Sequence, residues 1–443
     1  MINVITLILL TSLTQCLNGV PNEQNLTLEF VQIIWRHGDR SPIMFYPNDP
    51  YLNYWPQKPG MLTQEGMRQH YALGTYLRER YMPQFLNYHY LRNETYVLSS
   101  NVDRAIESAQ SNLAALYAPK DWQVWDSNLN WQPVPIHTIP ADEDHFLDVP
   151  MESCPRFEKI DLDFHNSDEY QEYNKTIWPF LEQLAKFTGA FLTLDNNSFI
   201  YDNLVCDQAH NLKLPSWATP EIMKQFEQSA NFEFYNLFRT KEQQRLLGGT
   251  LFKSIRNVFK DKIENNVERK LADKMVIYSA HDTTLIALTR LLDVFNYLRP
   301  PYASALLFEL YSDADKNYFV KLLYRNVTKT FDHEPFVLEL PFCNLESLCP
   351  WETFVGNSSK LVLEDWNQAC EISLLENLAQ LHENGHVARF LILALAFILG
   401  TFGVFLSIEL YCWYVKRRVI DPSKLKLDIT FYSSQDILNA NSA

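Results

Sequence analysis

The segment RHGDRSP at positions 36–42 places a histidine between two arginines. Guanidinium groups keep their charge and offer forked donors that match phosphate oxygens, which lysine does not. The imidazole of His37 can attack phosphorus when it is neutral, and Gly38 allows the backbone to approach closely. The segment therefore predicts a phosphate site with Arg36 and Arg40 as cations. The alternative is an exposed basic turn of the same composition.

Two further polar clusters follow apolar runs of the chain. Arg104 stands at the start of a predicted helix, after the run 96–99, and helix N-termini attract anions. His281 and Asp282 come directly after the apolar run 274–279. Taken alone, each cluster has an ordinary interpretation, as a solvated helix arginine or as a structural or capping His-Asp pair.

Together the three clusters contain the groups that phosphoryl transfer needs. His37 is the candidate nucleophile, because phosphorylating it divides one difficult displacement into two easier ones. Asp282, when protonated, can donate to the leaving alkoxide and later accept a proton from the attacking water. Since an aspartic acid in solution ionises near pKa ~4, this role favours acidic conditions. Four basic side chains would neutralise the phosphoryl oxygens: Arg36, Arg40, Arg104 and His281.

The order of strands and helices explains how separate clusters could meet. Residues 28–35, 96–99 and 274–279 are apolar enough for strands buried on both faces of a sheet. Helices are predicted over 64–81 and 103–116, which gives a βαβα order. Ligands of open α/β sheets bind outside the carboxyl ends of the strands. The three clusters are therefore expected to converge on one crevice.

The middle of the chain has a different pattern. From about 122 to 245 aromatic residues are dense, helices are predicted at 170–189 and 220–247, and no convincing parallel strand is found. The α/β pattern then returns, with a hairpin signal between strands at 304–311 and 318–324. We predict an α/β fold with a central, mostly parallel sheet flanked by helices, a mostly helical cap insertion over the crevice, and one C-terminal transmembrane helix.

Both ends of the chain carry targeting signals. A short apolar run at 4–13 predicts a secretory signal peptide, and the long apolar run at 390–408 precedes basic residues, as in a type I membrane protein. A buried core helix is the alternative for the second run. The predicted divisions are a signal peptide at 1–19, a catalytic domain with stem at 20–121 and 246–386, a cap at 122–245, a transmembrane helix at 387–415 and a cytosolic tail at 416–443.

Glycosylation sequons agree with an extracellular or lumenal catalytic domain. Six sequons precede the predicted span. Their asparagines are Asn25, Asn93, Asn174, Asn196, Asn326 and Asn357. The net charge of −15 argues against nucleic acid as a partner, so an anionic substrate would need a local basic pocket.

The motifs RHGDRSP, VDR and AHDTT resemble the histidine acid phosphatase family, in the second branch of the histidine phosphatase superfamily. The branch is marked by Asp282 directly after His281. The similarity to prostatic and lysosomal members covers roughly residues 28–370, through segments such as LTQEGMRQHY, WQPVPIHTIP and LDVFNYLRPPYAS. The resemblance implies hydrolysis of small phosphate monoesters through a phosphohistidine, with no metal and no other cofactor.

The resemblance also has implications for the cysteines and for location. It implies the disulfides Cys154–Cys370 and Cys343–Cys349. Family members pair the position of Cys206 with the position occupied here by Ala305, so Cys206 is expected to be a free thiol. The tail has no bulky apolar residue three positions after Tyr432, which leaves lysosome, endosome and cell surface open. Relatives are often dimers, so a homodimer is one option.

Other classes of protein have weaker marks in the sequence. A GNHE-type cluster, which marks metal-dependent phosphatases, is absent from the sequence. The Cys-x5-Arg spacing of cysteine phosphatases occurs only at Cys412 and Arg418, at the end of the predicted span and outside the predicted catalytic domain. A type I receptor that keeps the fold as an inactive binding module would be marked by loss of a catalytic residue, and none is missing. Nucleotide monophosphates, lysophospholipids, phosphoproteins and inositol phosphates all remain open as substrates.

Overall fold

The computed structural model describes residues 25–57, 59–148, 151–327, 334–372, 397 and 400–414. The chain divides into two compact units, Met1–Glu371 and Ile372–Ala443. The predicted signal peptide, residues 1–19, lies outside the described residues.

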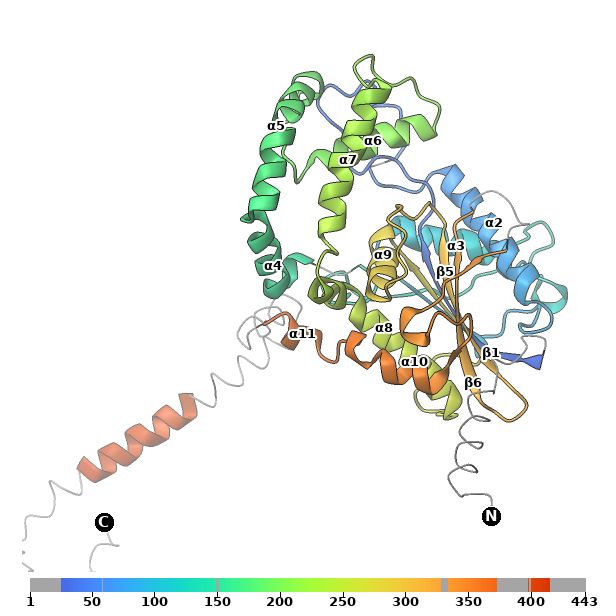
Figure 1. Ribbon diagram of the computed structural model, residues 1–443. Helices are drawn as coiled ribbons and strands as arrows, with labels where there is room; N and C mark the ends of the chain where they lie inside the picture. Colours follow the sequence, from blue (N-terminus) through green and yellow to red (C-terminus); the bar gives the residue numbers. More distant parts are fainter. Residues whose placement is uncertain are drawn as a thin grey trace, which may run out of the picture. The chain divides into compact units, whose positions relative to one another are not determined.

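An eight-stranded sheet forms the centre of the first unit (Figure 1). Its strand order is β3-β2-β4-β1-β5-β6-β7, and β8 also pairs with β6. The strands are β1 (Thr27–Arg36), β2 (Thr95–Ser99), β3 (His137–Thr138), β4 (Met275–Ala280), β5 (Ala305–Ser312), β6 (Tyr318–Arg325), β7 (Phe336–Val337) and β8 (Cys349–Pro350).

The sheet is mixed, so the prediction of a mostly parallel sheet was wrong. Strands β3, β2, β4 and β1 are parallel to their neighbours, whereas β5 pairs antiparallel with β1, and β6, β7 and β8 continue the antiparallel half. The expected hairpin joins β5 to β6 through a turn in which Asp313 accepts from the backbone N–H of Asp315 and Asn317. Such a short connection is possible only between antiparallel strands.

Strand β3 lies in the segment where no parallel strand was expected. It has two residues, which is too short for periodicity to reveal, and it pairs with Leu98 and Ser99 of β2. Farther along, Leu147 is buried in the core cluster beneath the sheet. This part of the chain therefore packs into the core of the sheet.

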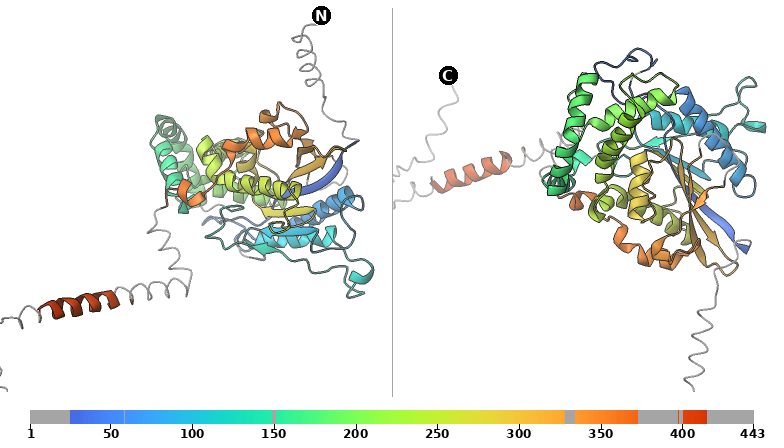
Figure 2. Two further views of the ribbon diagram at one scale, coloured as in Figure 1. Left: turned by 90° about the horizontal axis from the view of Figure 1, so that it is seen from below. Right: turned by 45° about the horizontal axis from the view of Figure 1, so that its top comes forward.

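Helices cover both faces of the sheet (Figure 2). One face packs against α2 (Gln64–Tyr81) and α3 (Asp103–Leu116), and the other against α8, α9 and α10. Successive side chains of a strand point to opposite faces, and so Val31 and Ile33 of β1 join the first core while Phe30 and Ile34 join the second. This explains why β1 is apolar almost throughout. The second set comprises α8 (Lys241–Ile263), α9 (Asp282–Leu291) and α10 (Trp351–Asn357).

A separate helical layer has its own core. Its helices are α4 (Pro155–His165), α5 (Asp168–Thr188), α6 (Asn197–Ala209) and α7 (Pro220–Asn236), and they gather beyond one end of the sheet (Figure 1). Leu184, Leu204 and Phe226 are fully buried between them, and Tyr46 from the loop after β1 packs into the same cluster. The loop that leaves β1 is thereby attached to the helical layer.

The cysteines are arranged as the resemblance implied. Cys154 forms a disulfide with Cys370, which follows α11 (Trp366–Ala369), and Cys343 forms one with Cys349. Cys206 in α6 is a buried free thiol. Among the sequons, Asn25, Asn93 and Asn357 are exposed, whereas Asn174, Asn196 and Asn326 are partly buried.

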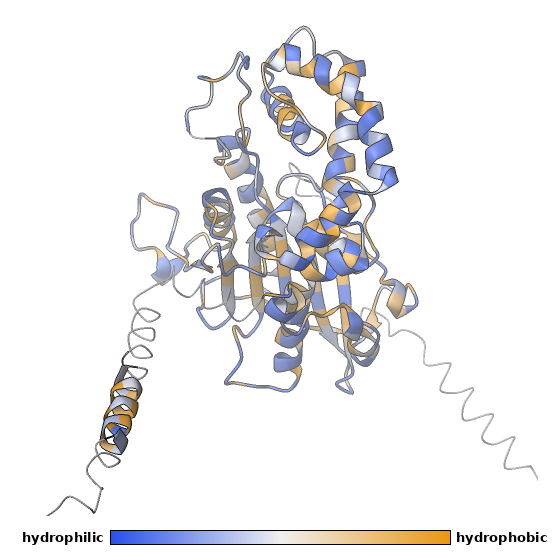
Figure 3. Cartoon of the chain, turned by 90° about the vertical axis from the view of Figure 1, so that its left-hand side faces the viewer, coloured by the Kyte–Doolittle hydropathy of each residue, from blue (hydrophilic) through white to orange (hydrophobic). Residues whose placement is uncertain are grey.

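The second unit is described only in part. Residues 400–414 form an exposed helix, much of which is hydrophobic (Figure 3). Within the described residues, none of the helices has the length and apolar character needed to cross a membrane. The remainder of the predicted span 387–415, apart from residue 397, and the predicted tail 416–443 lie outside the described residues.

Candidate active site

Three neighbouring parallel strands bring the predicted site residues to one edge of the sheet. His37 follows β1, His281 follows β4, and Arg104 lies in the first turn of α3, beyond β2. The imidazole rings of His37 and His281 have centroids 5.5 Å apart. Arg36 Nη2 is 3.1 Å from Asp282 Oδ2, at the start of α9. The convergence expected from the strand ends is present in the structure.

His37 is buried and held in one tautomer. Its Nδ1 lies 2.8 Å from the carbonyl oxygen of Gly38, and because a carbonyl only accepts, Nδ1 carries the proton and Nε2 keeps its lone pair. Burial, and then the charges of Arg104 and Arg36, lower the pKa of His37 well below its ordinary value. The imidazole is therefore neutral, which is the form that a nucleophile requires.

Arg36 is held by three groups. Its Nη1 donates to the carbonyl of Pro300 at 2.5 Å, and its Nη2 pairs with Asp282. Its guanidinium lies over the ring of Tyr302, 4.2 Å from the centroid, and that ring is 5.8 Å from the ring of His37. Neither Pro300 nor Tyr302 was predicted as a site residue, although the PPYAS segment was noted for its similarity.

Arg40 connects the loop of residues 36–42, hereafter the site loop, to the helical layer. Its Nη1 and Nη2 donate to the two carboxylate oxygens of Asp202 in α6, at 2.8 and 2.9 Å. Burial favours a neutral Asp202, but the charge and hydrogen bonds of Arg40, with the charge of Arg299, together outweigh this and lower the pKa of Asp202. Asp202 lies 162 residues beyond Arg40 in the chain, and no sequence signal pointed to it.

His281 differs from the cation that the sequence predicted. Its Nδ1 faces Arg104 Nη2 at 3.4 Å, and because a guanidinium only donates, the proton is on Nε2, which donates to Ser100 Oγ at 2.8 Å. Burial and the charge of Arg104 lower the pKa of His281 to about 3. His281 is therefore neutral here. Asp148, 3.7 Å from Nε2, was also missed by the sequence analysis.

Asp282 is ionised in this arrangement. Burial favours the neutral acid, but the charges of Arg36 and Arg299 outweigh it, so the pKa of Asp282 lies below its ordinary value. The carboxylate and Arg36 thus stabilise each other across the site.

Asp39 anchors the site loop to its surroundings. Its carboxylate accepts hydrogen bonds from the Thr63 hydroxyl and from His210 Nε2, the latter at 2.7 Å. Thr63 is the N-cap of α2, where its side chain accepts from the N–H of Gly66. Asp39 therefore joins the site loop to α2 and to the residue that follows α6. This role is structural.

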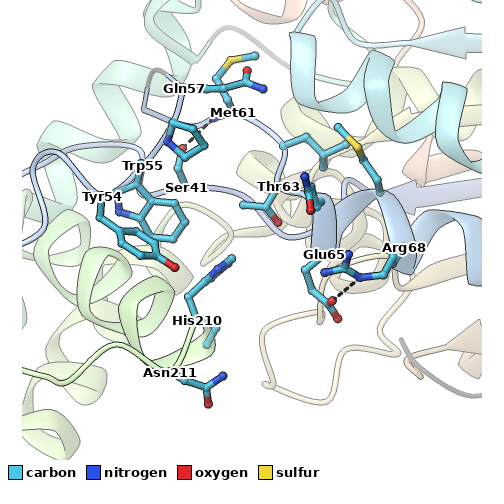
Figure 4. A pocket seen from close by; sticks show the side chains of 15 residues that line it. Ser41, Tyr54, Trp55, Gln57, Met61, Thr63, Glu65, Arg68, His210 and Asn211 are labelled. Carbon is cyan, nitrogen blue, oxygen red and sulfur yellow. Dashed lines mark hydrogen bonds and ion pairs between the residues drawn. The ribbon is translucent and has the colours of Figure 1, made fainter.

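A cavity of about 760 Å³ adjoins the site loop (Figure 4). Ser41 and Thr63 lie in its wall, as does His210, whose ring is 4.7 Å from that of Trp55. None of the predicted catalytic or phosphate-binding residues lines this cavity. It flanks the site loop and does not contain the nucleophile.

The chain is similar to known phosphatases in sequence and in fold. Lysosomal acid phosphatase of Homo sapiens is 40% identical over 372 residues, which cover 82% of this chain and 86% of that protein. Prostatic acid phosphatase of Bos taurus is 41% identical over 374 residues, covering 83% and 93%. Hafnia alvei phytase in complex with myo-inositol hexakis sulphate shares the fold with a TM-score of 0.59 at 18% identity, covering 79% of this chain and 99% of that chain.

The family model described as histidine phosphatase superfamily (branch 2) matches residues 27–325. This stretch includes the site loop, Arg104, His281 and Asp282. The chain therefore belongs to branch 2 of the histidine phosphatase superfamily.

Proposed function

We propose that this protein is an acid phosphatase that hydrolyses phosphate monoesters through a phosphohistidine on His37. The proposal rests on one observation above all: His37 is a neutral imidazole, protonated on Nδ1, whose pKa is depressed by burial and by the charges of Arg104 and Arg36. A nucleophile with an available lone pair beside fixed cations suits attack on a phosphate. The names of the relatives, lysosomal and prostatic acid phosphatase, support the same activity.

In the first step, His37 Nε2 attacks phosphorus and the bond to the ester oxygen breaks. Arg36, Arg40 and Arg104 would hold the three non-bridging oxygens, where charge accumulates. His281 would donate its Nε2–H to the phosphate in place of its hydrogen bond to Ser100 Oγ. The leaving alkoxide takes a proton from Asp282, so that the alcohol departs neutral.

In the second step, water attacks the phosphohistidine. Asp282, now a carboxylate, accepts a proton from that water, and the bond from phosphorus to His37 Nε2 breaks. Inorganic phosphate leaves, His37 regains its lone pair, and Asp282 is again protonated. The two steps together consume one water and release one alcohol.

The protonation of Asp282 must depend on substrate. In this structure its carboxylate is paired with Arg36 at 3.1 Å and its pKa is lowered. A bound phosphate would share the charge of Arg36 and place negative charge beside Asp282, and both effects raise the pKa of a carboxyl. Acidic conditions would then complete the protonation.

We also propose that the catalytic domain is lumenal or extracellular, anchored by the predicted span at 387–415. The two disulfides support this, because such bonds persist in oxidising compartments. The apolar helix at 400–414 would be part of that anchor.

The test is His37→Ala in the full chain, assayed with p-nitrophenyl phosphate at about pH 5, where an aspartic acid can act as general acid. We expect kcat to fall by on the order of 10³ or more, as for other lost nucleophiles. His89→Ala is the matched control, because His89 lies on the surface paired with Asp121. Hydrolysis that persists in His37→Ala would exclude the phosphohistidine.

A further inference from the structure

Arg299 lies between the site and the helical layer. It directly precedes Pro300, whose carbonyl accepts the hydrogen bond from Arg36, and Tyr302 follows two residues later, stacked on the same guanidinium. On its other side, the guanidinium of Arg299 lies 4.4 Å from the ring centroid of Phe234 in α7. Its backbone is thus attached to the phosphate-binding residues, while its side chain extends towards α7.

Within the described residues, the charge of Arg299 is not paired. Arg36 pairs with Asp282, and Arg40 pairs with Asp202. In the described part of the chain no carboxylate forms an ion pair with Arg299, and its Nε is buried without a hydrogen-bond partner. Buried charges and donors are normally satisfied in folded proteins. This guanidinium therefore has donor capacity that the protein itself does not use.

The charge of Arg299 acts on acidic groups of the site and also on Glu233 in α7, whose pKa it lowers against the larger effect of burial. The charge of Arg299 lowers the pKa of Asp282, and only burial and the charge of Arg36 have larger effects on that pKa. The charge of Arg299 also lowers the pKa of Asp202, where burial and Arg40 have larger effects. Arg299 directly precedes Pro300, whose carbonyl binds Arg36, and Arg36 pairs with Asp282. Because Asp282 serves the leaving oxygen in the proposed mechanism, Arg299 stands on the side of the alcohol.

We infer that Arg299 is an anion subsite for the alcohol part of the substrate, selecting phosphate monoesters that carry a second negative group. A carboxylate or a second phosphate can accept two parallel hydrogen bonds from a guanidinium. The phosphate being transferred would occupy Arg36, Arg40 and Arg104, and the second group would occupy Arg299. This inference rests on the proposed phosphatase function and narrows its substrate class.

The test uses two substrates that differ by one charge. Glycerol 2-phosphate and 2-phosphoglycerate are alike except that a carboxylate replaces one hydroxymethyl group. We expect the wild type to have the higher kcat/KM for 2-phosphoglycerate. In Arg299→Met, which keeps a flexible chain against Phe234 without the charge, the ratio of the two kcat/KM values should fall roughly tenfold or more, the size expected for a lost charge-assisted hydrogen bond.

Arg239→Met is the matched control. Arg239 also stacks on an aromatic ring, 4.3 Å from the centroid of Phe164, but its charge is already paired with Glu169 at 2.7 Å. The substrate ratio should be the same in this variant as in the wild type. Equal ratios in Arg299→Met and the wild type would overturn the inference.

The wild type alone also tests the inference. The inference can therefore be contradicted even if Arg299→Met does not fold. A wild-type kcat/KM that is lower for 2-phosphoglycerate than for glycerol 2-phosphate would overturn the anion subsite while leaving the phosphatase activity intact. Failure of the wild type to hydrolyse either ester, or p-nitrophenyl phosphate, would instead overturn the proposed function, and the inference with it.

Discussion

Arg36 and Asp282 form an ion pair, with 3.1 Å between Nη2 and Oδ2, that joins the end of β1 to the first residue of α9. The pair helps to keep Asp282 ionised, because the charges of Arg36 and the other nearby arginines, Arg299 and Arg40, together outweigh the effect of burial on its pKa. The proposed general acid is thus deprotonated until another group competes for Arg36. A bound phosphate is such a group.

Asp282→Asn should affect poor leaving groups most. The amide cannot transfer a proton, but nitrophenolate departs without one, so kcat/KM for p-nitrophenyl phosphate should fall little. For an alkyl ester such as glycerol 2-phosphate, we expect a loss of on the order of 10² or more, as is typical of a missing general acid. Steady-state kinetics with both substrates decide the matter. Equal losses would count against the general acid role.

Gly38 and Gly66 pack so closely that neither has room for a Cβ. A Cβ on Gly38 would lie 2.5 Å from the carbonyl oxygen of Gly66, and one on Gly66 would lie 2.3 Å from the carbonyl oxygen of Asp39. We expect Gly38→Ala to lower the free energy of unfolding by about 1–3 kcal/mol, as overpacking does, and to reduce activity by displacing His37. Chemical denaturation and kcat measure the two effects.

Gly356→Ala is the control for this pair. Gly356 belongs to α10, and, apart from its chain neighbours and the backbone of its own helix, no atom of the described residues lies within 4 Å of the position of its Cβ. Alanine should therefore raise the free energy of unfolding by about 0.5–1 kcal/mol through its helix propensity. If Gly38→Ala behaved like Gly356→Ala, the close contact with α2 would not govern the site loop.

The residues that could be predicted from the sequence share one property: each follows a buried strand at its carboxyl end. His37, Arg104 and His281 are marked by an apolar run that stops at a polar cluster, and such runs are readable because a strand covered on both faces must be apolar throughout. The directions of the strands beyond these three were harder to predict from the sequence. The antiparallel half of the sheet was misjudged even though its hairpin was recognised.

The residues that were missed come from elsewhere in the chain. Asp202 lies within a helix of the helical layer, and Ser100 and Tyr302 stand in ordinary loop sequence. Each acts through a neighbour, by pairing with Arg40, by accepting from His281 or by stacking on Arg36. Partners of this kind depend on long-range packing, which leaves no periodic signal. The protonation states of His281 and Asp282 depend on the same packing.

Cys206 should be chemically inert in the folded protein. It is 1% exposed, and burial raises the pKa of its thiol to about 12. Iodoacetamide should leave it unmodified in the native full chain, because the thiolate is the reactive form. In denaturant without reductant, Cys206 should be alkylated while the disulfide cysteines are not, as mass spectrometry of peptides would reveal. Detection of Cys206 in an internal bridge would contradict this pairing.

His70 should make the protein less stable in acid. It is fully buried in α2, its Nε2–H donates to the carbonyl of Arg36 at 3.0 Å, and burial lowers its pKa to about 3. A histidine in the unfolded chain has a pKa near ~6.5. Between these values the unfolded state binds a proton that the folded state does not. Stability should therefore fall as the pH drops from about 6.5 towards 3, by about 1.4 kcal/mol per pH unit.

His70→Gln isolates this contribution, because glutamine can still donate a hydrogen bond but does not titrate. The free energy of unfolding of the wild type should be measured at several pH values between about 4 and 6, within the interval set by the two pKa values. Its slope against pH should contain contributions from His70, His37 and His281. In the variant the slope should be smaller by about 1.4 kcal/mol per pH unit, whatever its absolute stability. His89→Gln, the same exchange at a histidine outside the site, is the matched control. An unchanged slope in His70→Gln would mean that His70 is protonated in the folded protein, and that the site loop rests on a charged histidine.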